Sequence, residues 1–180
     1  MKRIILLGYM GAGKTTIGKV LAREYKLDFY DLDWYIEDRF HKKIPDIFAT
    51  EGEARFREIE RKMLHEVAEF ENVVISCGGG TPCFFDNMAY LNRQGETVFL
   101  NAAPHVLKEH LLMGKSVRPL IQGKSPDELE SFVAENIQSR LPFYTQAKHT
   151  LNIDVIHTRE QILNYSRIIW DLTERPTNDF

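Results

Sequence analysis

Residues 8–15 contain the pattern that most restricts how this chain can fold. They read Gly-Tyr-Met-Gly-Ala-Gly-Lys-Thr and fit G-x-x-x-x-G-K-[ST]. At ordinary residue usage this pattern arises by chance at about four positions in 100,000. A continuous apolar run precedes it at 4–7 and a helical pattern follows it at 14–25. This strand–turn–helix context is typical of a phosphate-binding loop.

Such a loop binds phosphate oxygens with its backbone N–H groups, and the helix after it points its positive end at the anion. The lysine reaches the outer phosphates and the threonine hydroxyl binds Mg²⁺. We therefore expect a nucleotide phosphate site made of Gly11, Ala12, Gly13, Lys14, Thr15 and Thr16. A plain glycine-rich turn is the alternative. A dinucleotide-binding fingerprint fits less well, because position 16 is threonine rather than glycine.

The rest of the chain alternates short apolar runs with amphipathic helical patterns, which predicts an α/β fold with a parallel sheet. The expected strands are 2–7, 28–32, 73–77, 97–100 and 150–153. Helices are expected over 14–25 and 104–113, and three more should begin at the capping signals 50–53, 125–128 and 158–161.

Length and charge restrict the classes of function. A chain of 180 residues fits one domain. A formal net charge of −3 without a Lys/Arg-rich run gives no sign of nucleic-acid binding. The first apolar run is too short for a signal peptide or a membrane span, so we expect a cytoplasmic protein that binds no membrane. Two cysteines and no HExxH pattern give no sign of a zinc site.

Polar or glycine-rich residues follow three of the expected strands. Ligands of an open parallel sheet bind at the carboxyl ends of its strands, so Asp31, Asp33, Ser76 and the triplet Gly78–Gly80 should lie near the phosphate loop. One carboxylate can support a metal while the other orients a hydroxyl or accepts its proton. The alternatives are that Asp33 only caps a helix beginning at Trp34, that the triplet is only a tight turn, and that Ser76 bonds only backbone.

Three arginines are candidates for binding a charged substrate. Arg57 and Glu60 are spaced i, i+3 on one helical face, so Glu60 can position Arg57 to bind a carboxylate. Arg118 lies in a basic segment bounded by glycines over 114–123, which we expect to close as a lid over the transferred phosphate. The alternatives are a surface ion pair, an exposed basic loop and, for Arg140, a cation that complements a helix dipole.

Taken together, these residues resemble the shikimate kinase family over nearly the whole chain. The resemblance rests on the phosphate loop 8–16, the pair Asp31 and Asp33, the segment 56–60, the triplet Gly78–Gly80, the segment 118–120, and Arg140 with Tyr144. It implies a three-layer α/β/α domain over 1–180, with a five-stranded parallel sheet of the P-loop NTPase type, similar to nucleoside monophosphate kinases. It also implies a substrate-binding region over about 33–61, a lid over about 113–124, and a monomer.

The resemblance further implies transfer of the γ-phosphoryl group of ATP to the 3-hydroxyl of shikimate, with Mg²⁺, on the route to chorismate and the aromatic amino acids. Asp33 would hold the reacting hydroxyl and act as base, and Lys14 and Arg118 would neutralise charge on the transferred group. The implied substrate-binding residues are Asp33, Arg57, Glu60, Gly79, Gly80 and Arg140. The implied Mg²⁺ site is made by Thr15, with Asp31 and Ser76 acting through water.

The family contacts adenine with the loop after the fifth strand, here 154–159. The usual proline is absent from this loop, and Arg159 is the residue that we expect to contact ATP there, together with Arg118 from the lid.

Three other functions fit parts of the pattern. A kinase for another small acid or sugar, such as gluconate, would share the phosphate loop without needing Arg57 and Arg140. A non-catalytic nucleotide-binding switch would have the loop without Asp33 and Arg57. A nucleoside monophosphate kinase would need a pocket that reads a base, of which the short lid segment gives no sign.

Overall fold

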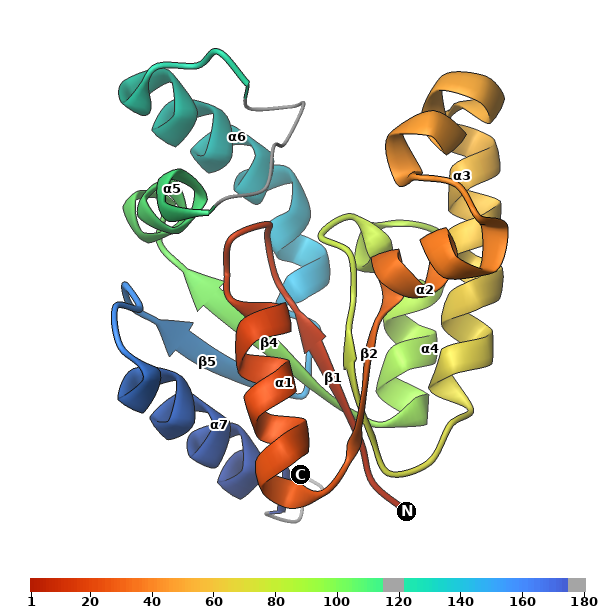
Figure 1. The fold of residues 1–180 in the computed structure, drawn as a ribbon, viewed down its shortest axis with the longest axis vertical. Coiled ribbons are helices and arrows are strands. Elements are labelled where there is room, and N and C mark those ends of the chain that lie inside the picture. Colours follow the sequence, from red (N-terminus) through yellow and green to blue (C-terminus); the bar gives the residue numbers. More distant parts are fainter. Residues whose placement is uncertain (115–121, 175–180) are drawn as a thin grey trace.

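The sheet has five parallel strands in the order β2-β3-β1-β4-β5, with β1 at its centre (Figure 1). The computed structural model describes residues 1–114 and 122–174. The strands are β1 (Arg3–Leu7), β2 (Asp28–Asp31), β3 (Val73–Ser76), β4 (Glu96–Ala102) and β5 (His149–Ile153). All five predicted strands are therefore confirmed, although β4 is longer at both ends than expected.

Side chains of the central strand point alternately to the two faces of the sheet, and both faces are buried. Ile4 and Leu6 belong to one cluster of buried apolar side chains, whereas Ile5 and Leu7 belong to a second cluster. A strand that is buried on both faces reads as a continuous apolar run rather than an alternating one. The strand ends at Leu7, so the loop that starts at Gly8 begins at the carboxyl edge of the sheet.

Helices cover both faces of the sheet and give the predicted three layers (Figure 1). The cluster with Ile4 and Leu6 packs under α1 (Lys14–Tyr25), α5 (Pro104–Met113), α6 (Pro126–Tyr144) and α7 (Arg159–Glu174). The other cluster packs under α2 (Leu32–Phe40), α3 (Ile44–Ala68) and α4 (Asn87–Gln94). Neither α4 nor the short 3₁₀ turn Thr81–Cys83 was predicted from the sequence. Within the described residues, no helix has both the length and the apolar character needed to cross a membrane.

Two of the three predicted capping signals form as expected. The Ser125 hydroxyl accepts a hydrogen bond from the Glu128 N–H at 3.3 Å, and the Glu128 carboxylate accepts one from the Ser125 N–H at 2.7 Å. Thr158 and Gln161 pair in the same way at the start of α7, at 3.2 and 2.9 Å. These caps need only residues close in sequence, so local pattern was enough to predict them.

The capping box predicted at 50–53 does not form, and α3 already begins at Ile44, although a second helical segment does begin after a break at Gly52. The Thr50 hydroxyl donates to a carbonyl one turn earlier in the same helix, at 2.7 Å, and caps nothing. Gly52 has φ 80° and ψ 169° and kinks α3 within its length. Ile47 is fully buried in the second cluster. Tertiary packing therefore stabilises an additional helical segment before the kink.

Candidate active site

The phosphate loop is the turn between β1 and α1, and its glycines have backbone conformations that other residues rarely adopt. Gly8, Gly11 and Gly13 have φ values of 143°, 86° and 94°. A Cβ atom at Gly8 would lie 2.8 Å from the Leu100 carbonyl oxygen in β4, so the loop is seated closely on the sheet. Gly13 is the N-cap of α1. The N–H groups of the first turn of α1, which have no partner within the helix, therefore begin at this loop.

The side chain of Lys14 turns back over the phosphate loop. Its ammonium group donates hydrogen bonds to the carbonyl oxygens of Gly8 at 2.8 Å and Tyr9 at 3.0 Å. Lys14 is buried. A positive charge and the N-terminus of α1 thus lie at the same turn, and both favour an anion there.

Three oxygen donors predicted for Mg²⁺ lie together beside this loop. The Thr15 hydroxyl donates to Asp31 Oδ2 at 2.7 Å. Asp31 and Ser76 are register partners at the ends of β2 and β3. Among residues 1–114 and 122–174, no group of three or more His, Cys, Asp or Glu side chains could hold a metal. These hydroxyl and carboxylate oxygens fit Mg²⁺, which keeps several waters and binds few carboxylates together with substrate phosphates.

Asp31, not Asp33, caps the helix that follows β2, so the capping alternative for Asp33 is wrong. Asp31 Oδ1 accepts hydrogen bonds from the N–H groups of Asp33 at 3.1 Å and Trp34 at 3.4 Å. The Asp33 carboxylate is thereby left for another role. Burial raises the pKa of Asp33 to about 6, with smaller contributions from the charges of Asp31 and Glu60. The Asp33 carboxylate therefore changes charge near neutral pH, where a general base is most effective.

Each glycine of the triplet after β3 leaves room for a different side chain of the predicted site. A Cβ atom would lie 2.9 Å from Asp33 Oδ1 at Gly78, 3.0 Å from Arg140 Nη1 at Gly79, and 2.8 Å from Arg57 Nη2 at Gly80. None of the three has a positive φ. The triplet is needed for close approach, and it brings the carboxylate of Asp33 and both guanidinium groups to one edge of the sheet.

Arg57 and Glu60 form a buried pair rather than a surface ion pair, so the surface alternative is wrong. Arg57 Nη1 donates to Glu60 Oε2 at 2.8 Å, and the exposed fractions of the two side chains are 13% and 2%. The Thr81 hydroxyl donates to Glu60 Oε1 at 2.6 Å. The Phe84 ring lies 4.0 Å from the Arg57 guanidinium carbon. With both oxygens of Glu60 bonded, the direction of the guanidinium group is set.

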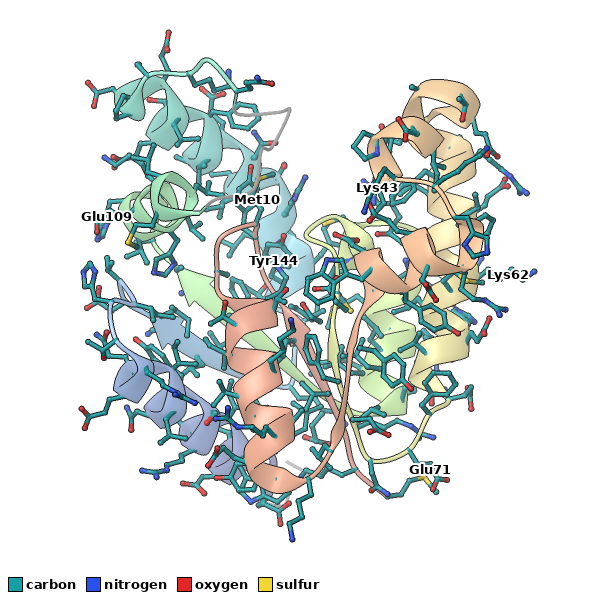
Figure 2. The ribbon with its side chains drawn as sticks, in the orientation of Figure 1. Met10, Lys43, Lys62, Glu71, Glu109 and Tyr144 are labelled. Atoms are coloured by element: carbon teal, nitrogen blue, oxygen red, sulfur yellow. The ribbon has the colours of Figure 1, made fainter. Side chains whose placement is uncertain are left out.

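Arg140 lies on α6 facing the same triplet. Its guanidinium carbon is 5.1 Å from the centre of the Tyr9 ring. The helix continues to Tyr144, so Arg140 does not lie in its last turn, where the helix-dipole alternative would place it. The Tyr144 hydroxyl donates to the Gly79 carbonyl at 2.6 Å and holds the triplet against α6. Figure 2 labels Tyr144 on α6 and Met10 in the phosphate loop.

A cleft of about 540 Å³ runs along this edge of the sheet. At one end it is lined by Asp31, Asp33, Ser76 and Gly78–Gly79, and in the middle by the phosphate loop. At the other end it is lined by residues of α5, of the segment after β5 and of α7. These residues are His110, Met113, Gly114, Ile156, His157, Thr158, Arg159 and Ile162.

Arg159, the first residue of α7, therefore lines this cleft. Sequence reasoning missed His110, Met113, Ile156 and Ile162. The expected loop at 154–159 was the only signal for Ile156, and the expected lid at about 113–124 was the only one for Met113. No motif marked His110 or Ile162. Arg118 lies outside the described residues, as does most of the expected lid.

Comparison with known proteins gives one consistent family. A family model described as shikimate kinase matches residues 10–169. The shikimate kinase of Bacteroides thetaiotaomicron is 56% identical over 174 residues, which cover 97% of this chain and 99% of the relative. A crystal structure of shikimate kinase from the same species has a TM-score of 0.93 at 55% identity and covers 97% of this chain and 99% of its own.

A second solved structure, the shikimate kinase of Acinetobacter baumannii in complex with shikimate, has a TM-score of 0.82 at 31% identity. The match covers 96% of this chain and 92% of the other. With the family model matching most of the sequence, and the same fold and identity above one half over nearly the full length, the chain belongs to the shikimate kinase family.

Proposed function

We propose that this protein transfers the γ-phosphoryl group of ATP to the 3-hydroxyl of shikimate. One observation carries the proposal: the triplet Gly78–Gly80 brings Asp33, Arg140 and Arg57 to a single edge beside a phosphate loop. A carboxylate near two guanidinium groups suits an acceptor that carries both a hydroxyl and a carboxylate. The family match favours the same acceptor over gluconate-type acids, a nucleoside monophosphate, or a switch without catalysis.

Arg57 and Arg140 bind the carboxylate of shikimate in this proposal. Each approaches a glycine of the triplet closely, Gly80 for Arg57 and Gly79 for Arg140, so the substrate ring lies over glycine backbone. Glu60 acts through Arg57, because it is fully buried and bonded to that side chain. A guanidinium held in one direction loses less freedom when it binds a carboxylate.

Asp33 accepts the proton of the reacting hydroxyl. With a pKa of about 6, its carboxylate is ionised near neutral pH yet basic enough to take a proton as the oxygen attacks phosphorus. The oxygen forms a bond to the γ-phosphorus, the bond to the ADP oxygen breaks, and the proton passes to Asp33. Phosphoryl transfer of this kind depends chiefly on positioning and charge neutralisation.

The nucleotide phosphates bind to the backbone N–H groups of Gly11–Thr16, in this proposal, and Lys14 leaves the loop carbonyls to reach the γ-phosphate. Thr15, Asp31 and Ser76 would hold Mg²⁺, the latter two through water. Magnesium, when bound, neutralises charge on the phosphate oxygens. Arg118 and Arg159 are further proposed contacts with ATP.

A coupled assay of ADP formation tests the proposal, with shikimate, gluconate and AMP offered separately as acceptors. We expect turnover with shikimate well above the ATP-only rate, and none above it with gluconate or AMP. Excess EDTA should abolish turnover, because it removes the Mg²⁺ that travels with ATP. Asp33→Asn should bind MgADP and shikimate without turning over. No stimulation by shikimate would refute the assignment. The single domain, the monomeric state and the cytoplasmic location stay predictions.

A further inference from the structure

His110 connects two parts of the cleft that are far apart in sequence. Its Nδ1 lies 2.7 Å from the carbonyl oxygen of Gly11 in the phosphate loop. The backbone N–H of Ile156, in the segment after β5, donates to its Nε2 at 2.8 Å. One imidazole ring on α5 therefore joins the phosphate loop to the segment between β5 and α7.

These two bonds determine which form of the ring is present. A backbone N–H can only donate, so Nε2 of His110 must be the unprotonated acceptor. The Gly11 carbonyl can only accept, so Nδ1 must carry the proton and donate. Both bonds exist together only for the neutral ring with its proton on Nδ1. The ring is used at both nitrogens, which is more than a packing role requires.

Packing adds a second connection between the same segments. The Cδ1 atom of Ile156 lies 3.4 Å from the place where a Cβ atom of Gly13 would be, so its side chain packs over the loop. Leu111, next to His110 on α5, packs in the same manner on Gly11, at 3.1 Å. The segment after β5 is thus held to the phosphate loop by one backbone bond through His110 and one apolar contact.

The end of the cleft near His110 can be assigned from what binds in the rest of the cleft. In the function proposed above, Asp33, Arg57 and Arg140 bind the acceptor and the phosphate loop binds the phosphates. The remaining end, lined by Met113, Ile156 and Ile162 with Arg159, is what the nucleoside part of ATP can occupy. The apolar side chains at this end suit an aromatic base. The polar side chains beside them are those of His110, His157, Thr158 and Arg159.

We propose that His110 is a positioning residue for the nucleotide. In its neutral Nδ1–H form it fixes the position of the segment at 154–158 relative to the phosphate loop. The surface for the base and the site for the phosphates are then the right distance apart for one nucleotide. The inference rests on the proposed function. His110 should therefore affect the affinity for nucleotide but not the affinity for shikimate, because neither of its hydrogen bonds reaches the acceptor end of the cleft.

Calorimetric titration of the full chain with MgADP and, separately, with shikimate tests this inference. His110→Phe keeps a planar ring and loses both hydrogen bonds. His110→Gln keeps one donor and one acceptor. His105→Phe is the matched control, since His105 is an exposed histidine on the same helix. We expect the Kd for MgADP to rise about tenfold in His110→Phe, which is about 1.4 kcal/mol. In His110→Gln the rise should be less than about threefold, and His105→Phe should equal the wild type.

Shikimate affinity decides between positioning and general damage. The Kd for shikimate should stay within about twofold of the wild type in all three variants. Loss of shikimate affinity in His110→Phe would overturn the inference, because it would show that His110 supports the fold in general rather than the nucleotide site. Wild-type MgADP affinity in His110→Phe, or equal loss in His110→Gln, would also overturn it. If the wild type itself fails to bind shikimate, the proposed function fails, whereas the comparison with MgADP still tests His110.

Discussion

Replacing Glu60 by glutamine tests whether a buried carboxylate holds the arginine that binds the acceptor. Both oxygens of Glu60 are engaged, one by Arg57 at 2.8 Å and the other by the Thr81 hydroxyl at 2.6 Å. Glutamine has nearly the same size and can still accept from Thr81. Its amide NH₂ group would then face the guanidinium of Arg57, so two donors meet where an ion pair was.

The magnitude follows from burial, and the chain offers a matched control on the same arginine. Glu53 Oε1 lies 3.3 Å from Arg57 Nη2, but its side chain is 59% exposed, against 2% for Glu60. Breaking a buried ion pair costs about 3–5 kcal/mol. Exposed pairs contribute about 0–1 kcal/mol. Glu60→Gln should therefore lower the free energy of unfolding by about 3–5 kcal/mol, and Glu53→Gln by less than about 1 kcal/mol.

Urea denaturation and steady-state kinetics measure the two consequences. The KM for shikimate should rise at least about tenfold in Glu60→Gln, since a misdirected Arg57 loses about 1.4 kcal/mol or more of binding. In Glu53→Gln it should change less than about twofold. The KM for ATP should stay close to the wild-type value in both. Equal effects of the two variants on stability and on the KM for shikimate would refute the reasoning from burial.

Three further predictions concern Asp33 and Gly80. Burial, and to a lesser extent the charges of Asp31 and Glu60, raise the pKa of Asp33 from 3.8 to about 6. The kcat/KM for shikimate should therefore fall tenfold per pH unit below about pH 6. A flat profile from about pH 5 to about pH 8 would contradict this expectation. A raised carboxyl pKa favours the folded state when protonated, and this stability is lost as pH rises through about 6. Asp33→Asn should therefore raise the melting temperature at about pH 8. Gly80→Ala should raise the KM for shikimate about 10–100-fold, because the new Cβ would lie 2.8 Å from Arg57 Nη2. The free energy of unfolding should change little, because φ of Gly80 is −87° and suits alanine. An unchanged KM would refute the close-approach explanation.

The sequence alone was sufficient for features that depend on near neighbours. The phosphate loop, the buried strand before it and the caps at Ser125 and Thr158 each involve residues within a few positions, so hydrogen bonding and hydrophobic pattern reveal them. Candidate side chains at the strand ends could also be identified, because parallel strands share one ligand-binding edge. The resemblance to a known family then assigned roles to them as a set.

Tertiary structure decided which of these residues meet. Asp31 rather than Asp33 caps α2, and the early start of α3 depends on packing of Ile47, which no capping signal shows. Each glycine of the triplet accommodates a different partner, and His110 reaches Gly11 from 99 residues away in sequence. Periodicity and turn chemistry carry information over a few residues only. Contacts across the sheet depend on strand order and helix packing, which the whole chain determines at once.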